Sequence, residues 1–237
     1  MPEKHFIEVE NDEEVAAVHH EAPGDRWLFF CHGFGSDKEG SYVGRCERAV
    51  ENGFNAVRFD FRGNGESHGK FIEQTLSSKI ADLKSVVDYF SPQSYVFFGS
   101  SFGGKVAFHA SQELEPGAVL GRAPVTYNSI MEKYRSVVEN KGEFTHHEGA
   151  TIDQRFFDDF DTYSFDEVAE TLEVPVAIFH GGADTTVHIE NTWNAADALE
   201  TDVTVQKLAG EKHHFSDAAE QKMQDIMFYW LETVWNR

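Results

Sequence analysis

Short apolar runs alternate with amphipathic helical stretches along the chain, and two further short runs lie near its start. Runs of this length are typical of strands, and their alternation with helices predicts a mostly parallel sheet covered on both faces. The two early runs, residues 5–9 and 15–19, predict an antiparallel pair at one edge. The other predicted strands are residues 27–31, 54–59, 95–98, 117–120, 174–179 and 203–208. The pattern therefore predicts an α/β protein.

Two stretches have clear helical spacing. In the first, apolar residues recur at steps of three or four and fall on one helix face: Ile72, Leu76, Ile80, Leu83, Val87 and Phe90. The second is the last helix, for which Asp217 and Glu220 predict a start that resembles a capping box. We interpret both apolar stripes as surfaces that pack on the sheet.

The segment 124–172 departs from the regular alternation because it is too long for a simple crossover between strands. It contains polar stretches, and no repeat, low-complexity tract or linker divides the chain. We therefore expect one domain over residues 1–237, with a small cap or lid at 124–172 inserted after the sixth strand.

A glycine-rich turn, GSSFGG, follows the predicted strand 95–98 and precedes a helical stretch. Only Ser101 in this turn has glycine two residues before it and two residues after it. A serine at such a strand-to-helix turn is held in a strained conformation, and its hydroxyl projects at the carboxyl edge of the sheet. The turn therefore predicts a nucleophile at Ser101, and an ordinary flexible turn is the alternative.

A serine nucleophile needs a histidine base and an acid that orients it. Asp184 follows the predicted strand 174–179 in a glycine turn, whereas the turn after strand 117–120 has no carboxylate. His213 and His214 both lie in the loop before the last helix, and either could be the base. The order serine, aspartate, histidine is one in which such groups occur along α/β chains.

Two turns after early strands complete the expected site. In HGFG, after strand 27–31, the glycines allow the Phe34 amide to join that of Phe102 in binding an oxyanion. We interpret the His32 side chain as structural. In the turn after strand 54–59, we expect Asp60 and Arg62 to interact and fix the loop.

The chain carries 41 Asp and Glu residues against 20 Lys and Arg, a formal net charge of −21. Such a field repels nucleic acid and anionic membranes, so we expect neither as a partner. The scattered acids predict a solvated surface, and adaptation to a high-salt cytoplasm is an alternative. No run could span a bilayer, and no signal peptide is present, which predicts a cytoplasmic protein.

We expect neither a metal nor a cofactor. The histidine pairs 19–20, 146–147 and 213–214 lack the spacing of helical or cysteine-containing zinc sites. The chain has no P-loop and no Rossmann fingerprint. Cys31 and Cys46 are too few for a disulfide framework, so we expect both to be reduced and structural.

These motifs together resemble the α/β-hydrolase superfamily. They are segments that follow predicted strands: HGFG at 32–35, DFRGNGES at 60–67, GSSFGG at 99–104, HGGAD at 180–184 and HHF at 213–215. The resemblance implies the α/β-hydrolase fold, with a mostly parallel eight-stranded sheet. It also favours His213 over His214, because family members often have the catalytic histidine two residues before a phenylalanine. In its compact size and in the insertion after the sixth strand, the chain resembles three groups of this superfamily. They are the small carboxylesterases, the cinnamoyl- or feruloyl-esterase-like group and the serine-aminopeptidase-like group.

The resemblance implies a hydrolase that cleaves small carboxylic esters through an acyl-enzyme on Ser101, without a cofactor. We expect Phe156 and Phe160 of the cap to bind substrate, and packing of the cap onto the core is the alternative. A peptidase, thioesterase or amide hydrolase would use the same three residues. A ligand-binding protein without catalysis is a further alternative.

Overall fold

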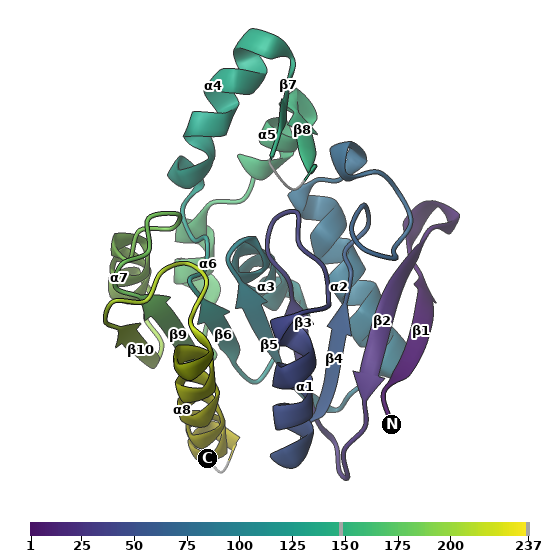
Figure 1. Cartoon of the computed structure of the whole chain (residues 1–237), viewed down its shortest axis with the longest axis vertical. Helices are drawn as coiled ribbons and strands as arrows, with labels where there is room; N and C mark the ends of the chain where they lie inside the picture. Colours follow the sequence, from purple (N-terminus) through teal and green to yellow (C-terminus); the bar gives the residue numbers. More distant parts are fainter. Residues whose placement is uncertain (147–148, 236–237) are drawn as a thin grey trace.

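The largest sheet forms the middle of the molecule (Figure 1). The computed structural model describes residues 1–146 and 149–235. The strands of this sheet are β1 (Glu3–Glu8), β2 (Glu14–His20), β3 (Arg26–Cys31), β4 (Asn55–Phe59), β5 (Ser94–Ser100), β6 (Val119–Arg122), β9 (Val176–Gly181) and β10 (Val203–Leu208). Their order across the 8-stranded sheet is β1-β2-β4-β3-β5-β6-β9-β10. β2 pairs antiparallel with β1 and β4, and the other pairs are parallel, which confirms the predicted fold class.

Helices cover both faces of the sheet because its strands are apolar on both sides. In β3, Leu28 and Phe30 pack with α1 (Ser41–Glu51) and α8 (Asp217–Trp235). Phe29 belongs to the other core cluster, with α2 (Leu76–Phe90) and α3 (Phe102–Leu114). This alternation follows from the two-residue period of a strand. Figure 1 shows the sheet between the two pairs of helices.

Two strands lie further along the chain than the sequence pattern predicts. β6 and β9 each begin two residues after the predicted start. In β9 the reason is Pro175, which has no amide hydrogen for the ladder; its carbonyl instead accepts from the Val119 amide (3.1 Å). The shift carries β6 as far as Arg122, which brings an arginine to the carboxyl edge of the sheet.

The predicted helical stripe is interrupted at its start. Ile72 lies in a separate 3-10 turn, η2 (Phe71–Glu73), and α2 begins at Leu76. Thr75 and Ser78 form a capping box in which each side chain accepts a hydrogen bond from the other's amide. The capping box starts α2 directly after Thr75, so Ile72 lies before the helix and does not share its apolar face.

The expected capping pair of the last helix is wrong. The Ser216 hydroxyl, rather than an Asp217 carboxylate, accepts a hydrogen bond from a first-turn amide, that of Ala219 (3.3 Å). Glu220 instead forms an ion pair with Arg45 of α1. Glu220, which the local sequence predicted to cap the helix, thus forms a contact with a distant segment of the chain instead.

The chain between β6 and β9 rises above the carboxyl edge of the sheet (Figure 1). Its elements are η3 (Asn128–Met131), α4 (Glu132–Lys141), β7 (Glu143–Thr145), β8 (Thr151–Asp153), α5 (Gln154–Phe160) and α6 (Phe165–Thr171). α6 packs against α3 and α7 (Glu190–Ala198), in the layer that covers the sheet. The raised part of the chain therefore ends with α5, before the end of the cap expected at 124–172. His147 and Glu148 lie outside the described residues.

Helix length and polarity bear on membrane insertion. None of the helices within 1–146 and 149–235 is long and apolar enough to cross a membrane.

Candidate active site

Ser101 lies at the sharp turn between β5 and α3. Its backbone has φ 54° and ψ −117°, which places a non-glycine residue at positive φ. A side chain at Gly103 would collide with the carbonyl oxygens of Cys31 and His32, and one at Gly99 would collide with the Gly103 carbonyl. The two glycines are therefore required by the close approach of β3, β5 and α3 at this turn.

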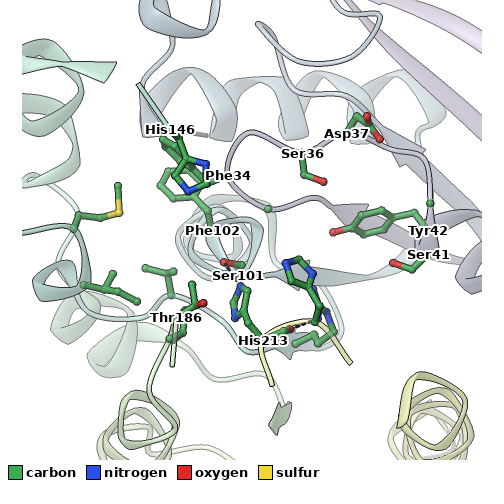
Figure 2. Close-up of a pocket in the computed structure, with 18 of the residues that line it drawn as sticks. Phe34, Ser36, Asp37, Ser41, Tyr42, Ser101, Phe102, His146, Thr186 and His213 are labelled. Atoms are coloured by element: carbon green, nitrogen blue, oxygen red, sulfur yellow. Dashed lines mark hydrogen bonds between the residues drawn. The ribbon is translucent and has the colours of Figure 1, made fainter. Parts of the chain in front are cut away.

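Ser101, His213 and Asp184 form a hydrogen-bonded series. His213 Nδ1 lies 2.7 Å from Asp184 Oδ2, and His213 Nε2 lies 3.1 Å from Ser101 Oγ. A carboxylate can only accept, so Nδ1 carries the proton and Nε2 is free to accept from the serine hydroxyl. Figure 2 shows Ser101 and His213 facing one another. The structure thus brings together the three residues that the sequence placed far apart.

Asp184 is held as a carboxylate by the turn after β9. Burial alone would raise its pKa, but hydrogen bonds from His180 and His213 and from the Thr186 amide outweigh burial. Its Oδ1 accepts from the amides of Thr186 (2.8 Å) and Val187 (3.0 Å). The pKa of Asp184 is therefore held well below its usual range, and the group stays charged beside His213.

His180 supports this turn, a role that the sequence analysis did not assign. Its Nε2 donates to the Val187 carbonyl (2.9 Å) and lies 3.4 Å from Asp184 Oδ2. Its Nδ1 accepts from the Thr192 hydroxyl of α7 (2.6 Å). The sequence offered no signal for this role, because the contacts come from a turn and a helix further along the chain.

The structure separates the two candidate histidines. His213 is half-buried between Ser101 and Asp184, whereas the neighbouring His214 is exposed at the cavity wall. The His213 carbonyl accepts a short hydrogen bond from Arg122 Nη1 (2.6 Å). Arg122 thus fixes the loop that carries His213, and no sequence pattern predicted that contact.

Phe34 and Phe102, whose backbone amides are the expected oxyanion donors, line the same cavity as Ser101. Phe102 is the first residue of α3, where helical amides have no partner within the helix. In the part of the chain that the structure describes, neither amide donates to a protein acceptor. Both are therefore available to a developing oxyanion beside Ser101.

His32 holds the turn that presents Phe34. Its Nδ1 donates to the Gly33 carbonyl (2.9 Å), and its Nε2 accepts from the Phe61 amide (3.1 Å). Burial lowers the pKa of His32 to about 3, so the ring is neutral at ordinary pH. The side chain is structural, as the sequence analysis expected.

The expected interaction between Asp60 and Arg62 is wrong. Asp60 forms a buried ion pair with Lys38 (2.6 Å) and accepts the Lys38 amide (2.7 Å). Arg62 instead donates to Asp82 of α2 (2.6 Å). Because β3 and β4 are parallel neighbours, the loops after them meet, and Asp60 finds its partner across that junction.

A cavity of about 360 Å³ opens in front of Ser101. In Figure 2, Ser36, Asp37, Ser41 and Tyr42 lie together on one side of Ser101. The cap contributes the side chains of Val125, Ile130, Met131, Lys133, Tyr134 and His146. The cavity therefore combines a largely polar wall from the β3–α1 segment with a largely apolar wall from the cap.

The expectation that Phe156 and Phe160 line the cavity is not met. Both are buried, and neither belongs to the cavity wall. Phe156 packs on Phe34 and Phe102, and Phe160 stacks on Phe102. These two rings fix the segment between β6 and β9 onto Phe34 and Phe102, which is the alternative that the sequence left open.

Other groups that could carry chemistry have structural surroundings. Cys31 and Cys46 are free and buried, and burial raises the pKa of both thiols. Within the described ranges, no group of three or more His, Cys, Asp or Glu side chains could hold a metal ion.

This fold, with serine, histidine and aspartate in series at the carboxyl edge of the sheet, defines the class of α/β-hydrolase-fold serine hydrolases. The model of the family described as serine aminopeptidase, S33, matches residues 22–140, about half of the chain. The chain belongs to that family.

Several curated proteins are similar in sequence. The chain is 26% identical to the mitochondrial palmitoyl-protein thioesterase ABHD10 of Pongo abelii over 183 residues, which are 71% of this chain and 60% of that protein. It is 28% identical to the uncharacterized protein YfhR of Salmonella typhi over 147 residues, 56% of this chain and 46% of that protein. The chain thus spans between 60% and 70% of the length of the thioesterase relatives.

Solved structures confirm the fold. Est1E from Butyrivibrio proteoclasticus with bound ferulic acid has a TM-score of 0.88 at 20% identity, over 98% of this chain and 100% of that chain. ABHD10 from mouse has a TM-score of 0.87 at 22% identity, over 98% and 99% of the two chains. The TM-scores establish the α/β-hydrolase fold, whereas identities this low leave the substrate open.

Proposed function

We propose that the protein is a carboxylic ester hydrolase that acts through an acyl-enzyme on Ser101. The observation that carries the proposal is the hydrogen-bonded series from Ser101 through His213 to Asp184. Such a series activates a hydroxyl that is otherwise a weak nucleophile. The cavity in front of Ser101 is of a size that suits a small ester.

In the first step, Ser101 Oγ attacks the ester carbonyl carbon, and its proton passes to His213 Nε2. The carbonyl oxygen becomes an oxyanion, which the amides of Phe34 and Phe102 stabilise. Asp184 stabilises the imidazolium and holds its orientation through Nδ1. The C–O bond then breaks, and the alcohol leaves with the proton from Nε2.

In the second step, water replaces the alcohol. His213 Nε2 takes a proton from water as the water oxygen attacks the acyl carbon. The same amides hold the second oxyanion, and the bond to Ser101 breaks as Oγ regains its proton. The acid is released, and the starting state of the protein is restored.

Ser101→Ala tests this proposal. We expect hydrolysis of p-nitrophenyl acyl esters to fall by about 10³-fold or more, because the nucleophile is lost. A fluorophosphonate should label the wild-type protein and leave the variant unlabelled. Undiminished hydrolysis by folded Ser101→Ala protein would falsify the mechanism, and unlabelled wild-type protein would favour a ligand-binding role.

Thioester hydrolysis is the second candidate, because similar curated proteins are named palmitoyl-protein thioesterases. Peptide or amide hydrolysis would use the same residues, as the family description indicates. We expect a panel of matched ester, thioester and aminoacyl amide substrates to show the highest kcat/KM for the oxygen ester. A higher value for the thioester would replace ester hydrolysis as the proposed function.

We further propose a small-molecule ester as the partner of this site and the cytoplasm as its location. The negative net charge supports the absence of nucleic acid and anionic membrane from its partners. Fractionation of the native cell, with activity followed in each fraction, tests the location.

A further inference from the structure

Arg122 lies at the end of β6 and contributes to the wall of the cavity in front of Ser101. The residue is 8% exposed. Its Nε donates to Ser100 Oγ (3.3 Å), and its Nη1 donates to the His213 carbonyl (2.6 Å). Both acceptors are uncharged, so these contacts orient the guanidinium without neutralising it.

Arg122 differs from the other arginines of the described chain, each of which has a carboxylate within 3.1 Å. These pairs are Arg26–Glu232, Arg45–Glu220, Arg48–Asp225, Arg58–Glu39, Arg62–Asp82, Arg135–Asp161 and Arg155–Asp153. Within residues 1–146 and 149–235, Arg122 forms no ion pair, and its Nη2 donates to no protein atom. The chain has twice as many acidic as basic residues, so carboxylates are abundant, and an arginine without an ion pair is unusual in it.

The two carboxylates that act electrostatically on Arg122, those of Glu220 and Asp184, are already engaged. Glu220 receives two hydrogen bonds from Arg45, at 2.5 and 2.9 Å. Asp184 is used by His213 and by the turn after β9. Burial, together with nearby Arg45, lowers the pKa of Arg122 to about 10, which leaves the guanidinium charged at neutral pH. The guanidinium carbon lies 5.3 Å from the centre of the Phe215 ring, a cation–π contact that stabilises the charge without neutralising it. Within the described residues no carboxylate pairs with this desolvated cation, which is costly, and an anion from the cavity would offset that cost.

The wall around this cation suits a polar group. Ser41 and Tyr42, at the start of α1, belong to the same cavity, and Figure 2 shows them on one side of Ser101. The Tyr42 ring packs against Arg45, next to the buried Ser100 hydroxyl that both arginines contact. The acids at this wall, Asp37 and Glu39, are exposed to solvent, and Glu39 is paired with Arg58.

We propose that Arg122 is a substrate-binding residue that recognises a carboxylate carried by the ester. The substrate is then an ester with an apolar portion against the cap and an anionic portion at Arg122. This inference rests on the proposed function, because it concerns the same cavity. It makes Arg122 a specificity determinant in addition to a residue that positions His213.

The test compares matched esters that differ only in charge. The acyl-side pair is mono-4-nitrophenyl adipate and its methyl-capped analogue, and the alcohol-side pair is 4-acetoxybenzoate and its methyl ester. For each pair, kcat/KM of the carboxylate ester is divided by kcat/KM of its neutral analogue. This ratio is then divided by the ratio of the rate constants with which hydroxide hydrolyses the same two esters without the protein, which corrects for their intrinsic reactivity. In one of the two pairs, we expect the corrected ratio to exceed one for the wild type. In Arg122→Gln, the corrected ratio for that pair should fall about ten-fold or more. That pair identifies which portion of the substrate carries the carboxylate.

The ratio separates recognition from positioning, because a displaced His213 would slow both esters of a pair equally. Arg122→Lys, which keeps the charge, should retain part of the preference. Lys133 of the cap is the rival cation in this cavity. Lys133→Gln should change the ratio less than about two-fold. A ratio that depends on Lys133 instead, or a wild type that favours the capped ester in both pairs, would overturn the proposal.

A binding measurement keeps this inference separate from the proposed function. In Ser101→Ala protein, calorimetry should give a Kd for the preferred carboxylate ester about ten-fold lower than in the Ser101→Ala, Arg122→Gln protein. Equal binding, or none, overturns the role of Arg122 even when neutral esters are hydrolysed. Tighter binding without any turnover in wild-type protein supports the anion site and contradicts the proposed function.

Discussion

The strained backbone of Ser101 is supported by bonds from three segments of the chain. A conformation such as φ 54°, ψ −117° costs a non-glycine residue about 1–3 kcal/mol. The Ser101 amide donates to the Arg122 carbonyl (2.9 Å), and the amides of Gly104 and Val125 donate to the Ser101 carbonyl (3.0 and 2.9 Å). These bonds come from β6, α3 and the start of the cap segment, so the whole carboxyl edge holds the hydroxyl in place.

At the same scale, His213 and His214 provide a paired test. His213→Ala should lower kcat for a p-nitrophenyl ester by about 10³-fold or more, because Ser101 loses the base to which it is bonded. His214→Ala should lower kcat less than about ten-fold, since His213 keeps its bonds to Ser101 and Asp184. The check is kcat for both folded variants under the same conditions. A larger loss at His214 would reverse the assignment of the base.

At the scale of elements, α3 joins the sheet to the raised cap through a buried lysine. Lys105 is 1% exposed, and its Nζ donates to the carbonyls of Thr126 (3.3 Å) and Tyr163 (2.9 Å). These two carbonyls lie at either end of the raised part of the cap. His109, one turn along α3, lies 3.2 Å from the same nitrogen. One side chain thus anchors both ends of the segment that forms the apolar cavity wall.

This anchor should make stability depend on pH. Burial lowers the pKa of Lys105 to about 7, whereas in the unfolded chain it is about 10.4. Between these values the unfolded state binds more protons than the folded state, so stability contributed at Lys105 rises with pH. Below about pH 7 both states are protonated, and the full cost of burying the charge is present.

Lys105→Met removes this titration. The free energy of unfolding of the wild type, relative to Lys105→Met, should therefore increase from pH 7 to pH 10, by up to about 1.4 kcal/mol per pH unit. Urea denaturation of both proteins at several pH values provides the measurement. A difference that stays constant over this window would show that Lys105 does not titrate there.

At the scale of the whole molecule, the net charge of −21 sets the response to salt. Several of the described acids are paired, but the excess of carboxylates over Lys and Arg leaves the folded state self-repelling. Salt screens such repulsion, since the Debye length falls from about 10 Å at 0.1 M to about 3 Å at 1 M. Repulsion is greater in the compact state than in the unfolded chain, so screening favours folding.

We therefore expect the melting temperature to rise by several degrees as NaCl increases from about 0.05 to about 1 M. Circular dichroism at each concentration measures it, and KCl at equal ionic strength is the control. Loss of structure at low salt would support the high-salt hypothesis. Full retention of structure and activity at low salt would leave the acids as an ordinary solvated surface.

The fold could be predicted largely from the sequence because strand and helix periods are local. The apolar runs predicted which segments form strands, and the glycines around Ser101 predicted the sharp turn between β5 and α3. Strand ends were less accurate: β6 reaches Arg122 because pairing with β9, and not composition, decides where the ladder stops. The predicted N-terminal capping pair of α8 was wrong for a similar reason, since Glu220 forms an ion pair with Arg45 of α1.

The sequence by itself determined the class of fold and the order of the candidate site, because backbone geometry at a glycine-rich turn depends on a few adjacent residues. Only the tertiary structure decided which histidine meets Ser101 and Asp184, and that Phe156 and Phe160 pack behind the cavity rather than in it. Among the residues that the structure describes, it also left Arg122 without a carboxylate partner. These outcomes depend on contacts between segments that are distant in the sequence. Burial and charge pairing at such contacts cannot be predicted from any short stretch of the chain.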